Sequence, residues 1–181
     1  MSVVATLELS VRDDWVDRYS ELVGQLAPAF GDRAAGFEHI GSTSVAGMVA
    51  KPIVDILVTL RDAPSATVLA AMGSLGFEYR GAFGVEHRHF FARADCHVHG
   101  FRPGEGEWAT HLLFRDFLRA DAAGRAAYTR FKLRTAEAVG WDRAAYQAAK
   151  DRFVTEFLPE AERWARRCGW TRPPVAGAVA R

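Results

Sequence analysis

The sequence predicts one domain with an α+β fold, in which a mixed sheet with flanking helices is followed by a helical C-terminal third. Apolar residues make up 49% of the 181 residues and charged residues 25%, as in an average globular protein. Short apolar runs alternate with helical patterns over the first two thirds, and from about Glu107 onward the pattern is helical. This segregation favours α+β over a regular βαβ repeat. We expect the domain to span residues 1–170 and residues 171–181 to form a flexible tail.

The N-terminal part of the chain predicts a helix followed by two strands. Apolar side chains recur at helical spacing from about Asp14 to Ala29. A brief strand from Phe37 to Ile40 ends at Gly41-Ser42, a strand-then-turn signal. The next strand includes Ile53 to Val58, where apolar residues on both faces indicate burial and a single charge stands in the middle.

A second helix and further strands follow. The helix opens at Pro64-Ser65 and stops at Gly76. Strands are expected from Phe77 to Arg80 and from Val85 to Arg93, with a glycine-containing turn between them, and a third from His97 to Phe101.

The helical third reads as three successive amphipathic helices. Their large apolar residues are Trp108, Leu112, Phe114 and Leu118, then Tyr128, Phe131 and Leu133, then Tyr146, Phe153, Phe157 and Trp164. Pro159 is expected to kink or end the last helix, because proline lacks the N–H that a helix interior needs.

The bulk composition excludes several classes of function. A formal net charge of +1 gives no global field for DNA, RNA or an anionic membrane, so we expect no extended nucleic acid and no membrane as partner. Cys96 and Cys168 lie outside any CxxC spacing, which argues against a disulfide framework and a cysteine zinc site. With no export signal or long apolar run either, the expected location is cytoplasmic.

Two neighbouring segments carry the residues suited to chemistry. A strand that runs into Gly41-Ser42 and a short turn exposes backbone N–H groups and hydroxyls, which together can hold a phosphate oxygen. Asp55 lies among apolar neighbours, where a carboxylate is costly unless it binds a metal or accepts hydrogen bonds. His97 and His99 share one face of their strand by its period of two.

These residues resemble the GrpB family, whose members carry GSTSV, then KP-apolar-apolar-D-apolar, and later a short H-x-H strand. The matching motifs here are GSTSVAGMVAKPIVDILV from Gly41, RHFF from Arg88, HVH from His97 and HLLFRDFLR from His111, in the family's order. The resemblance covers roughly Leu7 to Phe157 and implies a place in the DNA polymerase beta-like nucleotidyltransferase superfamily. In that superfamily a Gly-Ser turn positions the triphosphate and acidic residues bind divalent cations.

Carried over by position, the resemblance implies a phosphate-binding turn and a metal site. The implied phosphate-binding residues are Gly41, Ser42, Thr43, Ser44 and Lys51. The implied metal-binding and catalytic residues are Asp55, His97 and His99, and the implied cofactor is a divalent cation, either Mg²⁺, Mn²⁺ or a transition metal.

The sequence also departs from the superfamily pattern. In the superfamily, the strand that binds the metal usually carries D-x-D. Here Ile53 and Leu57 stand two residues before and after Asp55, so one of the paired carboxylates is missing. A third acidic residue is expected where His97 and His99 stand, and histidine binds zinc, iron or nickel better than magnesium. Both departures weaken a standard mechanism with two magnesium ions.

Each of these residues also has a structural interpretation. The histidine pair is equally suited to the polar face of an edge strand. Asp55 is also consistent with a buried structural carboxylate that is held by backbone N–H groups or by Lys51. The turn at residues 41–44 resembles an ordinary helix N-cap, and Lys51 either binds phosphate or is a solvated loop charge. Of Glu38 and His39, and likewise of Arg88 and His89, at most one faces the site.

The helix after Glu107 presents one more candidate cluster. His111, Arg115 and Arg119 share a face by i,i+4 spacing, which suits anion binding but is more often a solvated stripe. The scattered aromatic residues are expected in the core rather than in a base-stacking platform.

Three functions are consistent with this sequence. The first is an enzyme that transfers a nucleotidyl or related phosphate-containing group to a small acceptor with a divalent metal, so that its partner is a small molecule or nucleotide. The second is a non-catalytic accessory or binding module, because GrpB-like domains occur fused to dephospho-CoA kinase. The third is a small-molecule enzyme of another reaction type, with the histidines as general acid and base. For the catalytic readings we expect Asp55, His97 and His99 to converge on one pocket.

Overall fold

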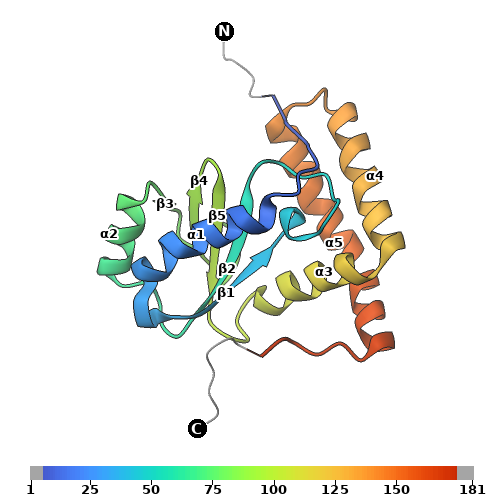
Figure 1. Cartoon of the computed structure of the whole chain (residues 1–181). Helices are drawn as coiled ribbons and strands as arrows, with labels where there is room; N and C mark the ends of the chain where they lie inside the picture. The colour runs from blue at the N-terminus through green and yellow to red at the C-terminus, as the bar shows by residue number, and fades with distance from the viewer. Residues whose placement is uncertain (1–5, 175–181) are drawn as a thin grey trace.

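The computed structural model describes residues 6–174, and for residues 150–156 only the helical backbone. Five strands form one sheet: β1 (Ala34–Ile40), β2 (Val54–Leu60), β3 (Glu78–Tyr79), β4 (His89–Arg93) and β5 (Cys96–Phe101). The α-helices are α1 (Trp15–Phe30), α2 (Ala66–Ser74), α3 (Trp108–Ala120), α4 (Ala122–Ala138) and α5 (Arg143–Cys168). Short 3₁₀ turns, Gly31–Arg33 and Ser42–Ser44, flank β1 (Figure 1).

The sheet is mixed, and its strand order is β1-β2-β5-β4-β3. β1 pairs with β2, β4 with β5 and β3 with β4 in antiparallel fashion, whereas β2 and β5 run parallel. A parallel pair cannot be joined by a tight hairpin, and here the crossover carries α2, β3 and β4. The predicted α+β class with a mixed sheet and a helical C-terminal third is thereby confirmed.

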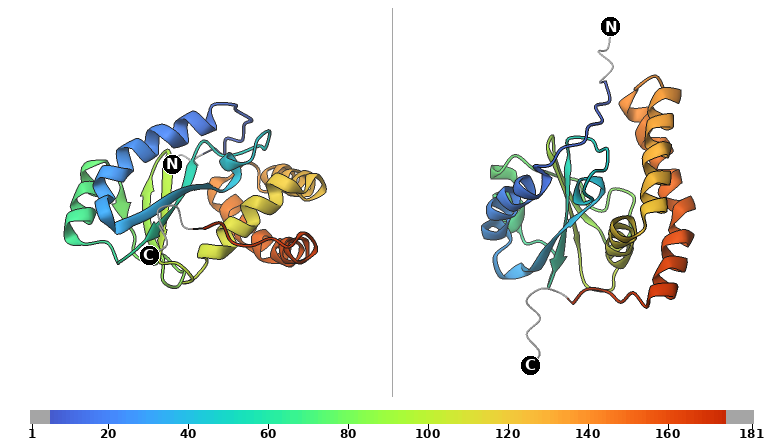
Figure 2. Two further views of the ribbon diagram at one scale, coloured as in Figure 1. Left: turned by 60° about the horizontal axis from the view of Figure 1, so that its bottom comes forward. Right: turned by 45° about the vertical axis from the view of Figure 1, so that its right-hand side comes forward.

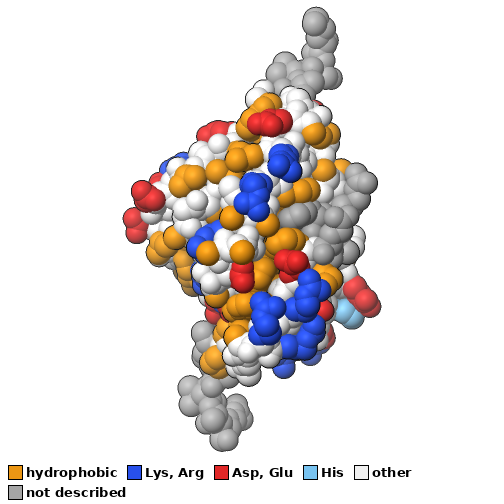
Figure 3. Space-filling view, turned by 90° about the vertical axis from the view of Figure 1, so that its right-hand side faces the viewer, with side chains coloured by type: hydrophobic (Ala, Val, Ile, Leu, Met, Phe, Trp, Pro, Cys, Tyr) orange, Lys and Arg blue, Asp and Glu red, His pale blue; other side chains and the backbone are white. Residues whose placement is uncertain are grey.

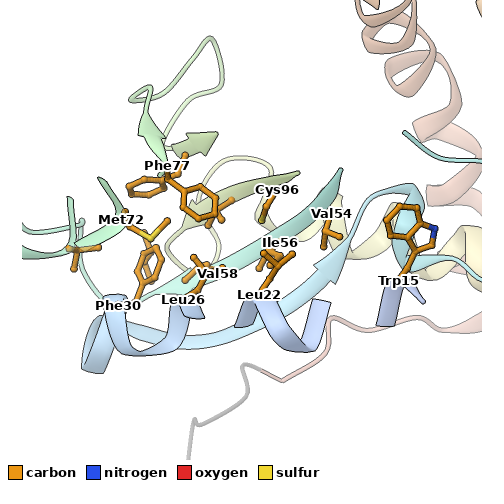
Figure 4. Packing of buried hydrophobic residues seen from close by; sticks show 14 residues of the cluster. Trp15, Leu22, Leu26, Phe30, Val54, Ile56, Val58, Met72, Phe77 and Cys96 are labelled. Atoms are coloured by element: carbon orange, nitrogen blue, oxygen red, sulfur yellow. The ribbon is translucent and has the colours of Figure 1, made fainter. Parts of the chain in front are cut away.

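One face of the sheet packs against α1 and α2 (Figures 1 and 2). The strands supply alternate residues to this face because side chains of a strand point to opposite sides in turn. Figure 4 shows the resulting cluster, in which residues of β2 and β5 meet the apolar faces of both helices. The buried members include Leu22, Leu26, Phe30, Val54, Ile56, Val58, Leu60, Val68, Met72, Cys96 and Val98.

The opposite face is covered by α3, and α4 and α5 pack beyond it (Figure 2). Leu57 and Phe101 from the sheet contact Trp108 and Leu112 of α3. A second cluster joins α3 to α4 and α5 and includes Val45, Met48, Phe117, Leu118, Tyr128 and Ala161. The 42–50 segment therefore lies between the sheet and the helical third.

Most predicted elements are confirmed with small shifts in their boundaries. The first helix spans Trp15–Phe30, and three helices follow Glu107 as expected. Two details differ from the expectations. Of the two alternatives given for Pro159, a kink or an end of the last helix, the end is wrong, because the helix continues to Cys168. Leu133, expected on the buried side of α4, is 37% exposed, and Tyr128 and Ala136 are buried instead.

The segment after α5 returns to the sheet side of the molecule. Trp170 donates from Nε1 to Asp116 Oδ2 of α3 at 3.0 Å, and the Arg172 guanidinium lies 5.6 Å above the Trp108 ring. Of the expected tail, residues 171–174 have no regular structure, and residues 175–181 lie outside the described part. Among the helices described, none is long and apolar enough to cross a membrane.

Candidate functional site

Asp55, His97 and His99 come together on the α3 side of the sheet. In β2, Val54 and Ile56 point to the α1 side, so Asp55 between them points to the other. The parallel register pairs Asp55 with His97, and His99 follows two residues later on the same face. Asp55 Oδ1 lies 3.4 Å from His97 Nδ1 and 3.5 Å from His99 Nε2.

The electrostatics of this cluster favour a charged carboxylate beside a neutral imidazole. Burial by itself raises the pKa of Asp55, but the contacts with His97 and His99 outweigh it, and the pKa lies well below its usual value. Burial is the main cause that lowers the pKa of His99, although Asp55 opposes the shift. These are the protonation states that metal binding requires of both ligands.

The donor atoms fit one metal ion. One donor from each of the three residues lies within 4.8 Å of the others. Ligands at about 2.0–2.2 Å in tetrahedral arrangement are roughly 3.3–3.6 Å apart, which matches both distances from Asp55. Within the described residues, Nδ1 of His99 is buried without a hydrogen-bond partner, and the polar contact of Nε2 is the one with Asp55 at 3.5 Å. A buried imidazole with so few polar contacts needs an explanation, and a cation provides one.

The chemistry of the donors also selects among metals. Two imidazoles and one carboxylate suit zinc, manganese, iron or nickel, whereas a site for two magnesium ions needs several carboxylates. Ile53 and Leu57, which flank Asp55 in the sequence, bring no oxygen donor, as the missing D-x-D pattern indicates. The residues present therefore fit a single transition-metal-type site and do not fit a pair of magnesium ions.

Gly41 lets the turn after β1 lie against Asp55. Its φ of +69° is in the region that favours glycine, and a Cβ at this position would lie 2.4 Å from Asp55 Oδ2. Ile40 is also the register partner of Asp55, so the turn begins beside the carboxylate. The Gly41-Ser42 turn and the metal donors thus belong to one site.

The hydroxyl groups of this turn already have partners within the protein. Ser42 Oγ accepts a hydrogen bond from Lys132 Nζ at 2.5 Å, and Ser44 Oγ donates to the Gly41 carbonyl at 2.6 Å. Thr43 is buried, and its Oγ1 lies 3.0 Å from Nε2 of His39. These contacts fix the shape of the turn.

Lys51 contacts α5. Its ammonium group donates to Gln147 Oε1 of α5 at 2.6 Å and lies 5.9 Å from the Tyr146 ring centre. The polar contacts of Asp55 are with the two histidines, so Lys51 does not hold this carboxylate. Lys51 is half-buried, and its ammonium group hydrogen-bonds to α5.

The flanking charged residues take structural positions. Glu38 is on the α3 side, where its Oε2 accepts a hydrogen bond from Arg115 Nη1 at 2.6 Å. His39 points to the α1 side and stacks on Tyr19 with ring centres 4.7 Å apart. The solvated stripe expected on α3 is wrong for Arg115, which is 5% exposed and also donates to Asp116. Arg119 donates to the Ser44 carbonyl and so supports the turn.

Aromatic side chains form a wall beside the two histidines. The Phe90 ring centre lies 5.3 Å from that of His97 and 5.1 Å from that of His99. The ring centre of His111 in α3 also lies 5.1 Å from the ring centre of His99. Arg88 reaches over Phe90, while the neighbouring His89 pairs with the hydroxyl of Tyr79 at the sheet edge.

Sequence reasoning missed two of these residues. The spacing of Lys132 could have predicted its burial. It lies four residues after Tyr128 and four before Ala136, and hence on the buried stripe of α4. Phe90 was expected only as part of a strand. Its contact with the histidines follows from the β4–β5 register, which pairs Phe90 with His99.

A groove of about 400 Å³ lies elsewhere, between α3, α4 and α5. Figure 3 shows basic side chains gathered toward the lower end of this face. Its lining includes Phe117, Gly124, Arg130, Arg163 and Arg167 and none of the expected site residues.

Comparison with known proteins finds close relatives along most of the chain. The model of the GrpB protein family matches residues 9–160. A UPF0157 protein of Streptomyces coelicolor is 38% identical over 162 residues, which cover 86% of this chain and 85% of that protein. The crystal structure of the conserved protein GrpB from Enterococcus faecalis superimposes with a TM-score of 0.79 at 30% identity and covers 87% of this chain and 99% of that one.

Some relatives are much longer than the matching region. The UPF0157 protein YqkA of Bacillus subtilis is 30% identical over 159 residues, but the match spans 46% of its length. A dephospho-CoA kinase of Mycobacterium bovis is 26% identical to 86% of this chain, again over 46% of the longer protein. The shared region therefore also occurs next to other sequence.

Proposed function

Because the chain belongs to the GrpB family, we propose that it is a metal-dependent enzyme that transfers a nucleotidyl or related phosphate-containing group to a small acceptor. The observation that carries this proposal is the cluster of Asp55, His97 and His99 beside the Gly41-Ser42 turn. A single divalent cation, with manganese or zinc favoured over magnesium, is held by the three side chains.

Each residue of the cluster has a defined task in this proposal. A divalent cation held there supplies Lewis acidity that polarises a phosphoryl group. Asp55 contributes the negative charge, while His97 and His99 contribute imidazole nitrogen donors. Gly41 lets the turn approach the carboxylate, so that a phosphate lying on the turn is also next to the metal donors.

Two buried contacts hold the turn in place for this role. Lys132 Nζ donates to Ser42 Oγ and to the Val49 carbonyl, at the two ends of the turn segment. This ammonium brings positive charge to the site where phosphate oxygens are expected. The ion pair between Glu38 and Arg115 fixes β1 against α3, so the strand that leads into the turn is rigid. Preorganised donors of this kind stabilise charge without rearrangement during the reaction.

A second candidate function is an accessory or binding module attached to another enzyme. It is favoured by the similarity to mycobacterial dephospho-CoA kinases, in which the matching region is 46% of the protein. Such a module needs no metal and no catalytic carboxylate. The third reading, general acid-base chemistry by the histidines, likewise needs no cation at Asp55.

One experiment separates these functions. Metal content is measured on the purified protein, and the melting temperature is recorded with Mn²⁺ or Zn²⁺, with and without nucleoside triphosphates, for the wild type and for Asp55→Asn. The matched control is Asp62→Asn, the same chemical change at an exposed loop position. We expect Asp55→Asn to abolish the metal-dependent shift while the metal-free protein melts within a few degrees of the wild type.

The opposite pattern would support the accessory module. If Asp55 is structural, Asp55→Asn leaves polar partners unsatisfied and costs about 1–3 kcal/mol of unfolding free energy. A destabilised variant with an unchanged metal and nucleotide response contradicts the metal-dependent transferase.

A further inference from the structure

The loop between β3 and β4 presents an aromatic ring to solvent close to the metal cluster. Phe83 is 59% exposed, although a phenyl ring is among the side chains most favoured inside a protein. The guanidinium groups of Arg80 and Arg88 lie 5.5 and 5.9 Å from its ring centre, and that of Arg80 is also paired with Glu78. An exposed ring beside these guanidinium groups suits a planar ligand that carries negative charge.

The backbone of this loop is held in an unusual shape. Phe83 has a φ of +44° and His87 a φ of +61°, so two of the three described non-glycine residues with positive φ lie in one loop. Arg88 fixes the loop by donating to the carbonyls of Ala82 at 3.1 Å and of Phe83 at 2.6 Å. Strain of this kind persists where the surroundings enforce it, and it concentrates at ligand sites.

A continuous row of rings connects Phe83 to the metal donors. The Phe83 and Phe90 rings are stacked, with centres 5.4 Å apart and planes at 21°. The Phe90 ring in turn contacts His99 at 5.1 Å and His97 at 5.3 Å. The exposed ring is thus one ring removed from the histidines.

We propose that Phe83 is the stacking platform for the planar base of the substrate, with Arg88 as the residue that positions it. This inference rests on the proposed function, because the phosphate end of the same substrate is placed at the metal donors. It narrows the substrate class to nucleotides and other phosphate esters that carry an aromatic ring. Sugar phosphates without an aromatic base lack the group that Phe83 recognises.

The test compares two ligands that differ only in the base. Binding of adenosine monophosphate and of ribose 5-phosphate is measured by calorimetry in the presence of Mn²⁺, for the wild type and for Phe83→Ala. We expect the wild type to bind adenosine monophosphate more tightly than ribose 5-phosphate. Phe83→Ala should weaken the binding of adenosine monophosphate about 5- to 150-fold, the range for loss of one base–aromatic stack. Binding of ribose 5-phosphate and of Mn²⁺ alone is expected to stay unchanged.

Two further variants make the result specific. Phe83→Trp keeps a stacking surface and is expected to retain the preference for the base. Trp141→Ala is the matched control, since Trp141 is also an exposed aromatic residue with positive φ but lies in the connection between α4 and α5. It is expected to bind both ligands like the wild type.

Three outcomes would overturn the inference. Equal affinity of the wild type for the two ligands shows that the base is not recognised, and leaves the metal-dependent transferase standing. An equal loss of affinity for the two ligands in Phe83→Ala shows that Phe83 affects the binding of the phosphate end or the folding of the protein. Failure of both ligands to bind the wild type in Mn²⁺ removes the proposed function together with this inference.

Discussion

The two faces of the sheet are made by the same strands and differ in their polar residues, because both bury apolar side chains but the α3 side also holds a cluster of one carboxylate and two imidazoles. On the α1 side, Val54 and Ile56 of β2 and Val98 of β5 are buried among apolar side chains. Asp55, which lies between Val54 and Ile56 in the sequence, points to the α3 side and contacts His97 and His99. The alternation of the strand therefore places the candidate site residues on the α3 side, and the residues next to them in the sequence in the core of the α1 side. A site on one face inherits a rigid backbone from the core on the other.

The largest expected effect comes from breaking the apolar face. Ile56 is fully buried, so Ile56→Ala should lower the free energy of unfolding by about 2–5 kcal/mol. The measurement is chemical denaturation, and metal affinity of the folded protein at low temperature is recorded in parallel. If the faces are separate, the affinity stays within about twofold of the wild type. A parallel loss of metal binding would show that the faces are coupled.

A smaller effect distinguishes the histidine on the α1 side from those on the α3 side. Burial, with Arg119 as the next cause, lowers the pKa of His39 to about 4. The unfolded pKa is about 6.5, so the unfolded chain binds more protons between pH 6.5 and pH 4. The contribution of His39 to stability is therefore complete above pH 6.5 and is lost as the pH falls through about 4.

The sign and size of this pH dependence can be measured directly. The full loss corresponds to roughly 3 kcal/mol, from 1.4 kcal/mol per pH unit. We expect the unfolding free energy of His39→Gln to fall less steeply than that of the wild type between pH 6.5 and 4. Identical slopes would exclude His39 as the source of the acid sensitivity.

The next prediction tests the close approach of the turn to the carboxylate. Gly41 and Gly47 have nearly the same φ, +69° and +71°, but only a Cβ at Gly41 would meet Asp55. Gly47→Ala should cost about 1 kcal/mol of stability because of its backbone conformation, and Gly41→Ala should cost more because its Cβ also overlaps Asp55. Gly41→Ala alone should also weaken metal binding by about tenfold or more, as displaced ligands do. Similar affinities of the two variants would separate the turn from the metal site.

The smallest effect concerns the two cysteines and needs no substitution. Cys96 is buried on the α1 face, and burial raises the pKa of its thiol to about 12, whereas Cys168 is exposed. Iodoacetamide at neutral pH should therefore label Cys168 in the native protein and reach Cys96 only after unfolding. Peptide mapping by mass spectrometry reads this out. Labelling of Cys96 at the same rate would mean that the α1 face opens readily.

The sequence allowed much of this arrangement to be predicted. Apolar residues on both sides of Asp55 indicated a buried strand, and the spacing of His97 and His99 placed them on one face. Periodicity does not say which strands are neighbours. That β2 and β5 are adjacent depends on a crossover of three elements, and the expectation that the three side chains converge therefore relied on the family resemblance.

Other features could not be read from local patterns. The hydroxyls of Ser42 and Thr43 looked available for a phosphate, but their partners lie on α4 and β1 and are visible only in the folded chain. Arg115 looked like a surface charge because its partner Glu38 is 77 residues away in the sequence. Pro159 was expected to kink or end its helix, yet the helix continues past it to Cys168.

The anchor of the turn on Lys132 has a consequence for the order in which the molecule assembles during synthesis. Ser42 and Lys132 are separated by 90 residues, so their contact closes a long loop of the chain. The three candidate metal-binding residues end at His99 and are all synthesised before α4. A nascent chain therefore contains all three residues while the turn has its local contacts but still lacks its contact with α4. Contacts that close such long loops slow folding, so the ammonium of Lys132 is expected to lock the turn in a late step.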